Sequence, residues 1–246
     1  MGAFLSSLLQ RRCLSCAEPM TRQEDEISAA GFCPECSAAL QPLRKGFCPV
    51  CGEIYAGGSE GLCPGCQSKL PPWGKTYFHA AYSSLLRELT HRLKFSGALH
   101  IASALGRLLA RHPGLLAASA NYDCVVPVPL HSSRLIERGF NQSVEVAREL
   151  SKISGLPLLS ALERTAPTRH QTGLSREQRL HNVRGAFMAL PPVKGKKILL
   201  LDDVMTTGAT LGVAAKALLS AGACAVDVVV VARTPARNML KAVRGN

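Results

Sequence analysis

The sequence predicts an α/β protein in which helices cover both faces of a parallel sheet, preceded by a small cysteine-rich segment. Beyond residue 76, short apolar runs of strand length alternate with stretches that have the apolar spacing of amphipathic helices. Continuously apolar strands are typical of a sheet that is buried on both faces. Before that point, eight of the ten cysteines fall within the first 66 residues. We therefore expect two domains, at 1–72 and 76–246.

Four C-x-x-C pairs make up the cysteine-rich segment. A gap of two residues lets both thiolates of a tight turn point at one ion, and two such turns complete a tetrahedral site. Disulfide bonds are the alternative, but they need an oxidising compartment, and we recognise no export signal. We expect two structural zinc ions bound in sequence order, although interleaved pairing would use the same residues. The ligands are Cys13, Cys16, Cys33 and Cys36 for the first ion and Cys48, Cys51, Cys63 and Cys66 for the second.

A proline pair, Pro71 and Pro72, follows the cysteines and suits a stiff, non-helical connector. Two segments with helical spacing come next, at 83–95 and 98–112. Their apolar residues recur every three or four positions, so each segment has one apolar face. These residues are Leu85, Leu89 and Leu93 in the first segment and Ile101, Leu105, Leu108 and Leu109 in the second.

Three apolar runs, at 123–130, 196–203 and 224–233, are predicted as strands. Amphipathic helices at 141–155 and 209–222 separate them, and each ends at a glycine. This alternation predicts parallel strands, and such sheets bind ligands at the carboxyl ends of their strands. The two remaining cysteines, Cys124 and Cys224, lie beside apolar strand residues, and we expect both to be buried.

Two adjacent carboxylates, Asp202 and Asp203, end the central predicted strand. They repel each other and need hydrogen-bond donors, and a vicinal diol supplies two. The loop that follows offers hydroxyls and the free N–H groups of a helix start, which together suit a phosphate. A ribose 5-phosphate fits both halves. The alternatives are an ordinary turn with a threonine N-cap and a Mg²⁺-binding carboxylate pair. The loop residues are Thr206, Thr207, Gly208, Ala209 and Thr210.

Positive charge is concentrated in the second predicted domain. The formal net charge is +12, and residues 1–75 hold seven basic and seven acidic residues, so the whole excess lies in 76–246. This excess of positive charge favours binding of phosphate-bearing ligands or nucleic acid. The alternative is a basic surface that is merely solvated. No apolar run approaches the ~18 residues of a membrane span. We expect a cytoplasmic protein.

Three stretches, in this order behind the cysteine pairs, resemble the ComF family (competence protein F, GntX-like). They are "VVPVPLHSSRLIERGFNQ", "RHQTGLSREQRLHNVRGAF" and "ILLLDDVMTTGAT". The third is similar to the phosphoribosyl-pyrophosphate (PRPP) motif of type I phosphoribosyltransferases. The resemblance implies that fold behind a double zinc ribbon. It also implies PRPP binding, with the aspartates on the ribose diol and the threonine loop on the 5-phosphate.

Further residue roles follow from the same resemblance. A loop after the first core strand holds pyrophosphate, and a flexible loop, here about 165–185, closes over the site with Arg164 at its start. Mg²⁺ would sit mainly on the pyrophosphate and the diol. An exposed basic helix is the alternative for the second loop. Lys94 matches a family motif without an assigned role. The pyrophosphate loop is Pro129, Leu130, His131, Ser132, Ser133 and Arg134, and the other arginines are Arg169, Arg176, Arg179 and Arg184.

Two classes of function stay open. The first is a PRPP-binding phosphoribosyltransferase of unknown acceptor, linked to nucleotide metabolism or to DNA uptake in natural competence. The second is a catalytically weak or inactive protein of the same fold that binds single-stranded DNA during transformation, alone or with DNA-uptake proteins. Aromatic residues make up only 5% of the chain, which weakens the second reading because single-strand binding relies on base stacking.

Overall fold

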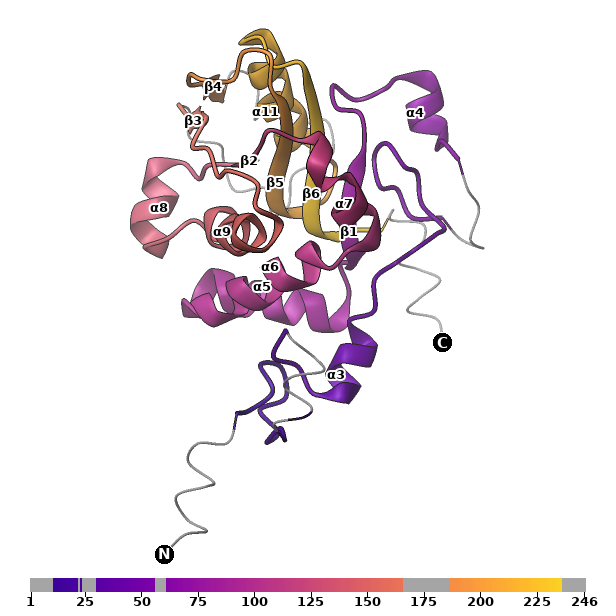
Figure 1. Cartoon of the computed structure of the whole chain (residues 1–246), viewed down its shortest axis with the longest axis vertical. Helices are drawn as coiled ribbons and strands as arrows, with labels where there is room; N and C mark the ends of the chain where they lie inside the picture. Colours follow the sequence, from indigo (N-terminus) through magenta and orange to yellow (C-terminus); the bar gives the residue numbers. More distant parts are fainter. Residues whose placement is uncertain (1–10, 22, 24–29, 56–60, 166–185, 236–246) are drawn as a thin grey trace, which may run out of the picture.

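A computed structural model of the chain describes residues 11–21, 23, 30–55, 61–165 and 186–235 (Figure 1). Its main sheet has four strands that all pair in parallel, in the spatial order β1-β6-β5-β2. The strands are β1 (Thr76–Ala81), β2 (Cys124–Pro127), β5 (Lys197–Met205) and β6 (Ala225–Arg233). A two-stranded antiparallel sheet joins β3 (Leu162–Arg164) to β4 (Phe187–Ala189). The predicted α/β fold with a parallel sheet is confirmed.

The two central strands are the long apolar runs of the sequence. β5 and β6 have nine residues each, and Ile198–Leu201 and Val228–Ala232 are fully buried. β2 is an edge strand, which explains how Pro127 is tolerated opposite Leu201. β5 continues two residues beyond the predicted end, to Met205. The aspartate pair therefore lies just inside the strand.

Helices cover both faces of the sheet. On one face lie α5 (Ser84–Ser96), α6 (Leu99–Ala110) and α9 (Gln142–Ser154), and on the other lies α11 (Ala209–Ser220) (Figure 1). Gly155 has φ +74° and ends α9 as predicted. The shorter helices are α3 (Pro34–Ala39), α4 (Pro64–Ser68), α7 (Pro113–Ala118), α8 (Ser132–Arg138) and the 3₁₀ turn η2 (Ser119–Asn121). No helix in the described ranges has the length and apolar character that crossing a membrane requires.

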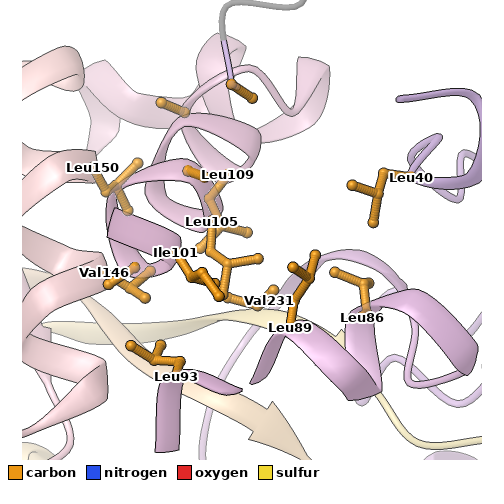
Figure 2. Close-up of a cluster of buried hydrophobic side chains, with 14 of the residues drawn as sticks. Leu40, Leu86, Leu89, Leu93, Ile101, Leu105, Leu109, Val146, Leu150 and Val231 are labelled. Atoms are coloured by element: carbon orange, nitrogen blue, oxygen red, sulfur yellow. The ribbon is translucent and has the colours of Figure 1, made fainter. Parts of the chain in front are cut away.

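The larger core cluster lies between the helical layer and the sheet (Figure 2). The predicted faces of α5 and α6 are confirmed there, because Leu89, Leu93, Ile101, Leu105 and Leu109 are fully buried. The other two predicted residues, Leu85 and Leu108, are only partly buried. From the neighbouring elements, Val146 and Leu150 of α9 and Val231 of β6 complete the labelled cluster.

The cysteine-rich region has two segments: the first contains Cys13 to Cys36 and the second contains Cys48 to Cys66. They lie against different parts of the α/β domain. Met20, Phe32 and Leu40 of the first segment share the core cluster of α5 and α6, and Figure 2 shows Leu40 facing that cluster from a separate ribbon. The second segment runs beside β1, where the Thr76 N–H donates to the Pro49 carbonyl at 3.1 Å. Figure 1 shows the second segment, with α4, on the side of β1 and β6.

Several elements escaped the sequence analysis. β1 follows the predicted connector. It was not predicted because it contains the polar residues Thr76 and His79, which interrupt the apolar pattern of a buried strand, although both residues are buried. The short β3–β4 hairpin and α8 are too brief for periodicity to detect. Cys124 is buried as predicted, but Cys224 is exposed, because it lies in the turn before β6 and not in the strand.

Candidate functional site

A pocket of about 240 Å³ opens at the carboxyl ends of β2 and β5. It contains every residue of the predicted diol and phosphate sites, including Asp202, Asp203 and Gly208. The chain brings them together because β5 ends there and only three residues separate it from the start of α11. The described lining consists of Tyr82, Lys94, Val128, Pro129, Leu130, Arg134, Arg138, Gln142, Arg164 and residues 202–211.

The two aspartates have different partners. Lys94 of α5 places its Nζ 2.5 Å from Asp203 Oδ2, and both side chains are largely buried, with 23% and 7% exposed. Asp202 Oδ1 accepts hydrogen bonds from Ser143 Oγ at 2.8 Å and from the Asp203 N–H at 2.9 Å. Asp203 therefore has a counter-ion of its own, whereas Asp202 has neutral donors only among these contacts.

Burial and charge set the protonation of this group. Burial, together with the neighbouring Asp203 charge, raises the pKa of Asp202 to about 7, although the Ser143 hydrogen bond opposes that shift. Burial by itself would lower the pKa of Lys94, but the negative charges of Asp203 and Asp202 outweigh it and raise the pKa. At neutral pH, Lys94 is charged and Asp202 is close to its titration midpoint.

The threonine loop turns sharply into α11. Gly208 has φ +75° and is the residue that precedes the helix. A side chain at this position would be strained, and its Cβ would lie 3.0 Å from the ring of Trp73. Thr207 Oγ1 accepts from the Ala209 N–H at 3.3 Å. Residues 208–211, at the start of α11, line the pocket, and a helix N-terminus in that position suits a phosphate group.

Positive charge outweighs negative charge around the pocket. Among the described lining residues, Lys94, Arg134, Arg138 and Arg164 are basic, and only Asp202 and Asp203 are acidic. Arg138 donates to Gln142 Oε1 at 3.0 Å, and Arg164 lies over the Phe187 ring at 5.4 Å. The excess of two positive charges suits a ligand that carries several negative charges.

The predicted pyrophosphate loop is a loop only in its first half. Pro129, Leu130 and Arg134 line the pocket. His131 caps α8, because its Nδ1 accepts from the Ser133 N–H at 3.3 Å, and Ser132 is the first residue of that helix. His131 and Ser132 are not among the lining residues.

The predicted flexible loop is only partly visible. Arg164, at its start, lines the pocket at the end of β3. The other four arginines, Arg169, Arg176, Arg179 and Arg184, lie outside the described residues.

Four polar residues of the site were not predicted from the sequence. Arg138 and Gln142 lie within the "RGFNQ" stretch that carried the family resemblance, and Ser143 follows it, so that stretch was the available signal. Tyr82 follows the unpredicted strand β1 and had no signal of its own. Lys94 was noticed without a role, and its role is the ion pair with Asp203.

The eight paired cysteines form two clusters in sequence order. In each cluster the four Sγ atoms lie within 4.8 Å of one another. Cys16 and Cys33 have sulfurs 3.7 Å apart, and Cys51 and Cys63 have sulfurs 3.5 Å apart. A disulfide needs about 2.05 Å, whereas a tetrahedral zinc ion with bonds of about 2.3 Å separates its sulfurs by about 3.8 Å. The donor sets therefore fit zinc, and the sequence-order grouping is the one that the structure has.

Comparison with known proteins gives a consistent picture. Residues 119–244 match the family model of the phosphoribosyl transferase domain. The chain is 40% identical over 170 residues to DNA utilization protein YhgH of Escherichia coli K12, covering 68% of this chain and 75% of that protein. It is 32% identical over 162 residues to competence protein F of Haemophilus influenzae, covering 62% and 69%.

Among solved structures, glutamine phosphoribosylpyrophosphate amidotransferase from B. subtilis matches at 24% identity, covering 52% of this chain and 25% of that one. The TM-score of this match is 0.37.

Proposed function

This chain belongs to the phosphoribosyl transferase domain family, and we propose that its pocket binds PRPP. One observation carries the proposal. A single cavity joins the carboxylates at the end of β5, the start of α11 and four basic side chains. These are the groups that a ribose carrying a 5-phosphate and a 1-pyrophosphate needs.

The contacts suggest how the ligand is oriented. The ribose hydroxyls donate to Asp202 and Asp203, and the 5-phosphate accepts from the backbone and hydroxyls of 206–210. The pyrophosphate then faces Arg134 and Arg164. We also propose that the arginines of 169–184, which lie outside the described residues, take part in pyrophosphate binding, since cations suit that group.

The site suits a Mg²⁺ ion that binds together with PRPP. Asp203 is already paired with Lys94, so Asp202 is the carboxylate that remains for an ion. Hard oxygens of the pyrophosphate and the diol would supply most of the coordination, which suits a cation that retains waters and substrate ligands. The ion would neutralise part of the pyrophosphate charge.

If the protein is a transferase, the bond from ribose C1 to pyrophosphate breaks while an acceptor bonds to C1. The chain's own residues then orient the ribose and stabilise the leaving charge, which is mainly a matter of positioning and electrostatics. The acceptor stays unassigned. We propose that the protein acts in the cytoplasm, where reduced thiols would keep the cysteine clusters able to hold zinc.

A second candidate is binding of single-stranded DNA. Among the relatives, one is named a DNA utilization protein and another a competence protein. One surface feature favours this candidate. Phe95 is 67% exposed, its ring centroid lies 4.5 Å from that of His91 in a tilted arrangement, and the Arg138 guanidinium lies 5.4 Å from its ring centroid. Arg138 also lines the pocket, so an aromatic and cationic surface adjoins the proposed PRPP site. Such surfaces stack bases.

Calorimetric titration with PRPP·Mg²⁺ tests the first proposal. The variants are Asp202→Asn alone and combined with Asp203→Asn, with Glu88→Gln as a matched control because that side chain is 58% exposed on α5. Each lost charge-assisted hydrogen bond costs about 1–3 kcal/mol, so affinity should fall about 5- to 150-fold per aspartate. Wild-type affinity in a folded, zinc-replete double variant would refute the assignment.

The same proteins test the second candidate. Labelled single-stranded DNA is titrated at two salt concentrations, and nucleic-acid binding through phosphates gives a steep decline of affinity with salt. If the protein binds single-stranded DNA at this surface, Phe95→Ala and Arg138→Gln should both weaken DNA binding. Phe95→Ala should leave the affinity for PRPP unchanged. A protein that binds PRPP and shows no salt-dependent DNA binding would leave only the first proposal.

A further inference from the structure

Arg233, at the end of β6, lies buried between the second cysteine cluster and the threonine loop, with 5% of its surface exposed. On one side, its Nε donates to the Cys51 carbonyl at 3.1 Å and its Nη2 contacts Glu53 Oε2 at 2.9 Å. On the other side, its Nη1 donates to the carbonyls of Met205 and Thr206. The Arg233 guanidinium thus connects the turn of the second cysteine cluster, at Cys51 and Glu53, to the start of the loop at 205–210.

Trp73 makes a second bridge between the same two parts. Its indole N–H donates to the Val50 carbonyl, in the turn between Cys48 and Cys51, at 2.8 Å. It also donates to Thr76 Oγ1, in strand β1, at 3.0 Å. Its ring edge lies beside Gly208 and Gly212, where an added Cβ atom would come within 3.0 Å and 3.6 Å of the ring, respectively. The ring therefore fills the space behind the turn that starts α11.

The shape of the turn between Cys48 and Cys51 depends on the metal site of the second cysteine cluster. Cys48 and Cys51 flank Val50, and the short turn is closed by hydrogen bonds from the Gly52 N–H to the Cys48 carbonyl and from the Cys48 N–H to the Glu53 carbonyl, both at 2.8 Å. Four-thiolate segments of this size hold their fold through the ion. Loss of the ion would displace the carbonyls of Val50 and Cys51, and both bridges would lose their partners on that side.

We propose that Arg233 and Trp73 are positioning residues that couple metal binding at the cluster of Cys48, Cys51, Cys63 and Cys66 to the shape of the phosphate loop at 205–210. Coupling of this kind is reciprocal, so a ligand on the loop retains the metal as strongly as the metal favours the ligand. The ligand half of the argument rests on the proposed PRPP binding, whereas the effect of the metal on the loop does not.

The first cysteine cluster supplies an internal comparison. Its segment packs on α5 and α6, where Arg92 donates to the Leu14 carbonyl at 2.9 Å, and shares the core cluster of those helices. The residues that flank the second cluster, such as Phe47 and Ile54, pack instead against the core cluster that contains Trp73 and Leu211. Opening the first cluster should therefore leave the threonine loop unchanged.

Hydrogen exchange of the amides of 203–211, measured by mass spectrometry on the full-length protein, tests the metal half without any ligand. Cys66→Ser opens the second cluster and Cys16→Ser opens the first. We expect exchange in this peptide to accelerate at least about tenfold in Cys66→Ser and to stay at the wild-type rate in Cys16→Ser. Equal exchange in Cys66→Ser and the wild type would overturn the proposal.

Conservative variants keep the test valid if Cys66→Ser fails to fold. Arg233→Lys retains the charge and loses the fork of donors, and Trp73→Phe retains a ring and loses the N–H. Both should bind two zinc ions and yet show accelerated exchange at 203–211. Arg92→Lys, the matched change beside the first cluster, should not. Wild-type exchange in both Arg233→Lys and Trp73→Phe would refute the bridging role.

Release of zinc to a chromogenic chelator tests reciprocity. PRPP·Mg²⁺ should slow release from the second cluster, identified with the two serine variants, by about 5-fold or more, and leave the first cluster unaffected. Arg233→Lys should lose this protection. If wild-type protein does not bind PRPP, the proposed function fails, and the exchange measurements still decide the coupling. Bound PRPP that protects neither cluster, or both equally, would contradict it.

Discussion

Lys94→Met removes the ammonium group that pairs with Asp203 and keeps most of the side-chain volume. The pair lies at 2.5 Å, and only 23% of the Lys94 side chain and 7% of the Asp203 side chain are exposed. At that distance and an effective dielectric constant of about 20, two unit charges attract by about 7 kcal/mol. Most of this attraction offsets the desolvation of the two ions, so the net value of the pair is much smaller.

Removal of one partner is costly because it leaves the other charge buried. Such changes typically cost about 3–5 kcal/mol, and the partial exposure of Lys94 places the expected loss in free energy of unfolding near 3 kcal/mol. The double variant Lys94→Met, Asp203→Asn removes both charges, and we expect it to be more stable than Lys94→Met alone.

Urea unfolding at pH 7.5, with zinc content held equal, measures both effects. Much of the loss in Lys94→Met should be recovered in the double variant, because the second substitution removes the uncompensated charge of Asp203. Lys94→Gln is a second variant of similar size that retains a donor. A free energy of unfolding for Lys94→Met within 0.5 kcal/mol of the wild type, a margin typical of surface substitutions, would refute the buried-pair reasoning.

Three further predictions concern the pocket and the metal sites. Because burial raises the pKa of Asp202 to about 7, the folded chain retains a proton that the unfolded chain releases near pH 4. This group's contribution to stability therefore falls as pH rises from about 4 to 7. PRPP affinity should rise through pH 7 as Asp202 ionises, and Asp202→Asn should flatten that rise in titrations at pH 6 and 8. Gly208→Ala should cost about 1–3 kcal/mol and weaken PRPP binding, since φ is +75° and Trp73 blocks the Cβ; Gly212→Ala, with an ordinary 3.6 Å contact, is the control and should be neutral. Elemental analysis should find two zinc ions per chain, and one ion or none would contradict the assignment of both clusters.

Local pattern was enough to predict the middle of the fold. β5, β6, α9 and α11 are long and strongly apolar or amphipathic, so their identity depends on residues that are adjacent in the sequence. β1 could not be recognised in this way. His79 is buried with its Nε2 2.5 Å from the Leu40 carbonyl, and Thr76 bonds to the Val50 carbonyl. These polar residues of β1 form hydrogen bonds with the cysteine-rich segments, and such long-range contacts cannot be predicted from sequence periodicity.

The candidate site shows the same division. The run 202–210 was predicted as one unit because the strand end, the turn and the helix start are contiguous. Lys94 and Ser143 reach the aspartates from helices more than 50 residues away in the sequence, so their contacts depend on how those helices pack. Equal roles for the two aspartates were expected from the sequence, and the separate partners of Asp202 and Asp203 came only from the fold.

The ion pair also bears on the choice between transfer and binding. In a transfer reaction, positive charge develops at ribose C1, and carboxylates near the ribose stabilise it. Lys94 neutralises one of the two carboxylates at 2.5 Å, which removes part of that stabilisation. The same ammonium lines the pocket, where its charge would favour any ligand that carries several negative charges, and only interactions that strengthen in the transition state accelerate a reaction. We therefore expect Lys94, in the arrangement that the structure describes, to favour the bound ligand over the transition state. On this argument, tight PRPP binding with slow transfer fits the pocket better than rapid turnover.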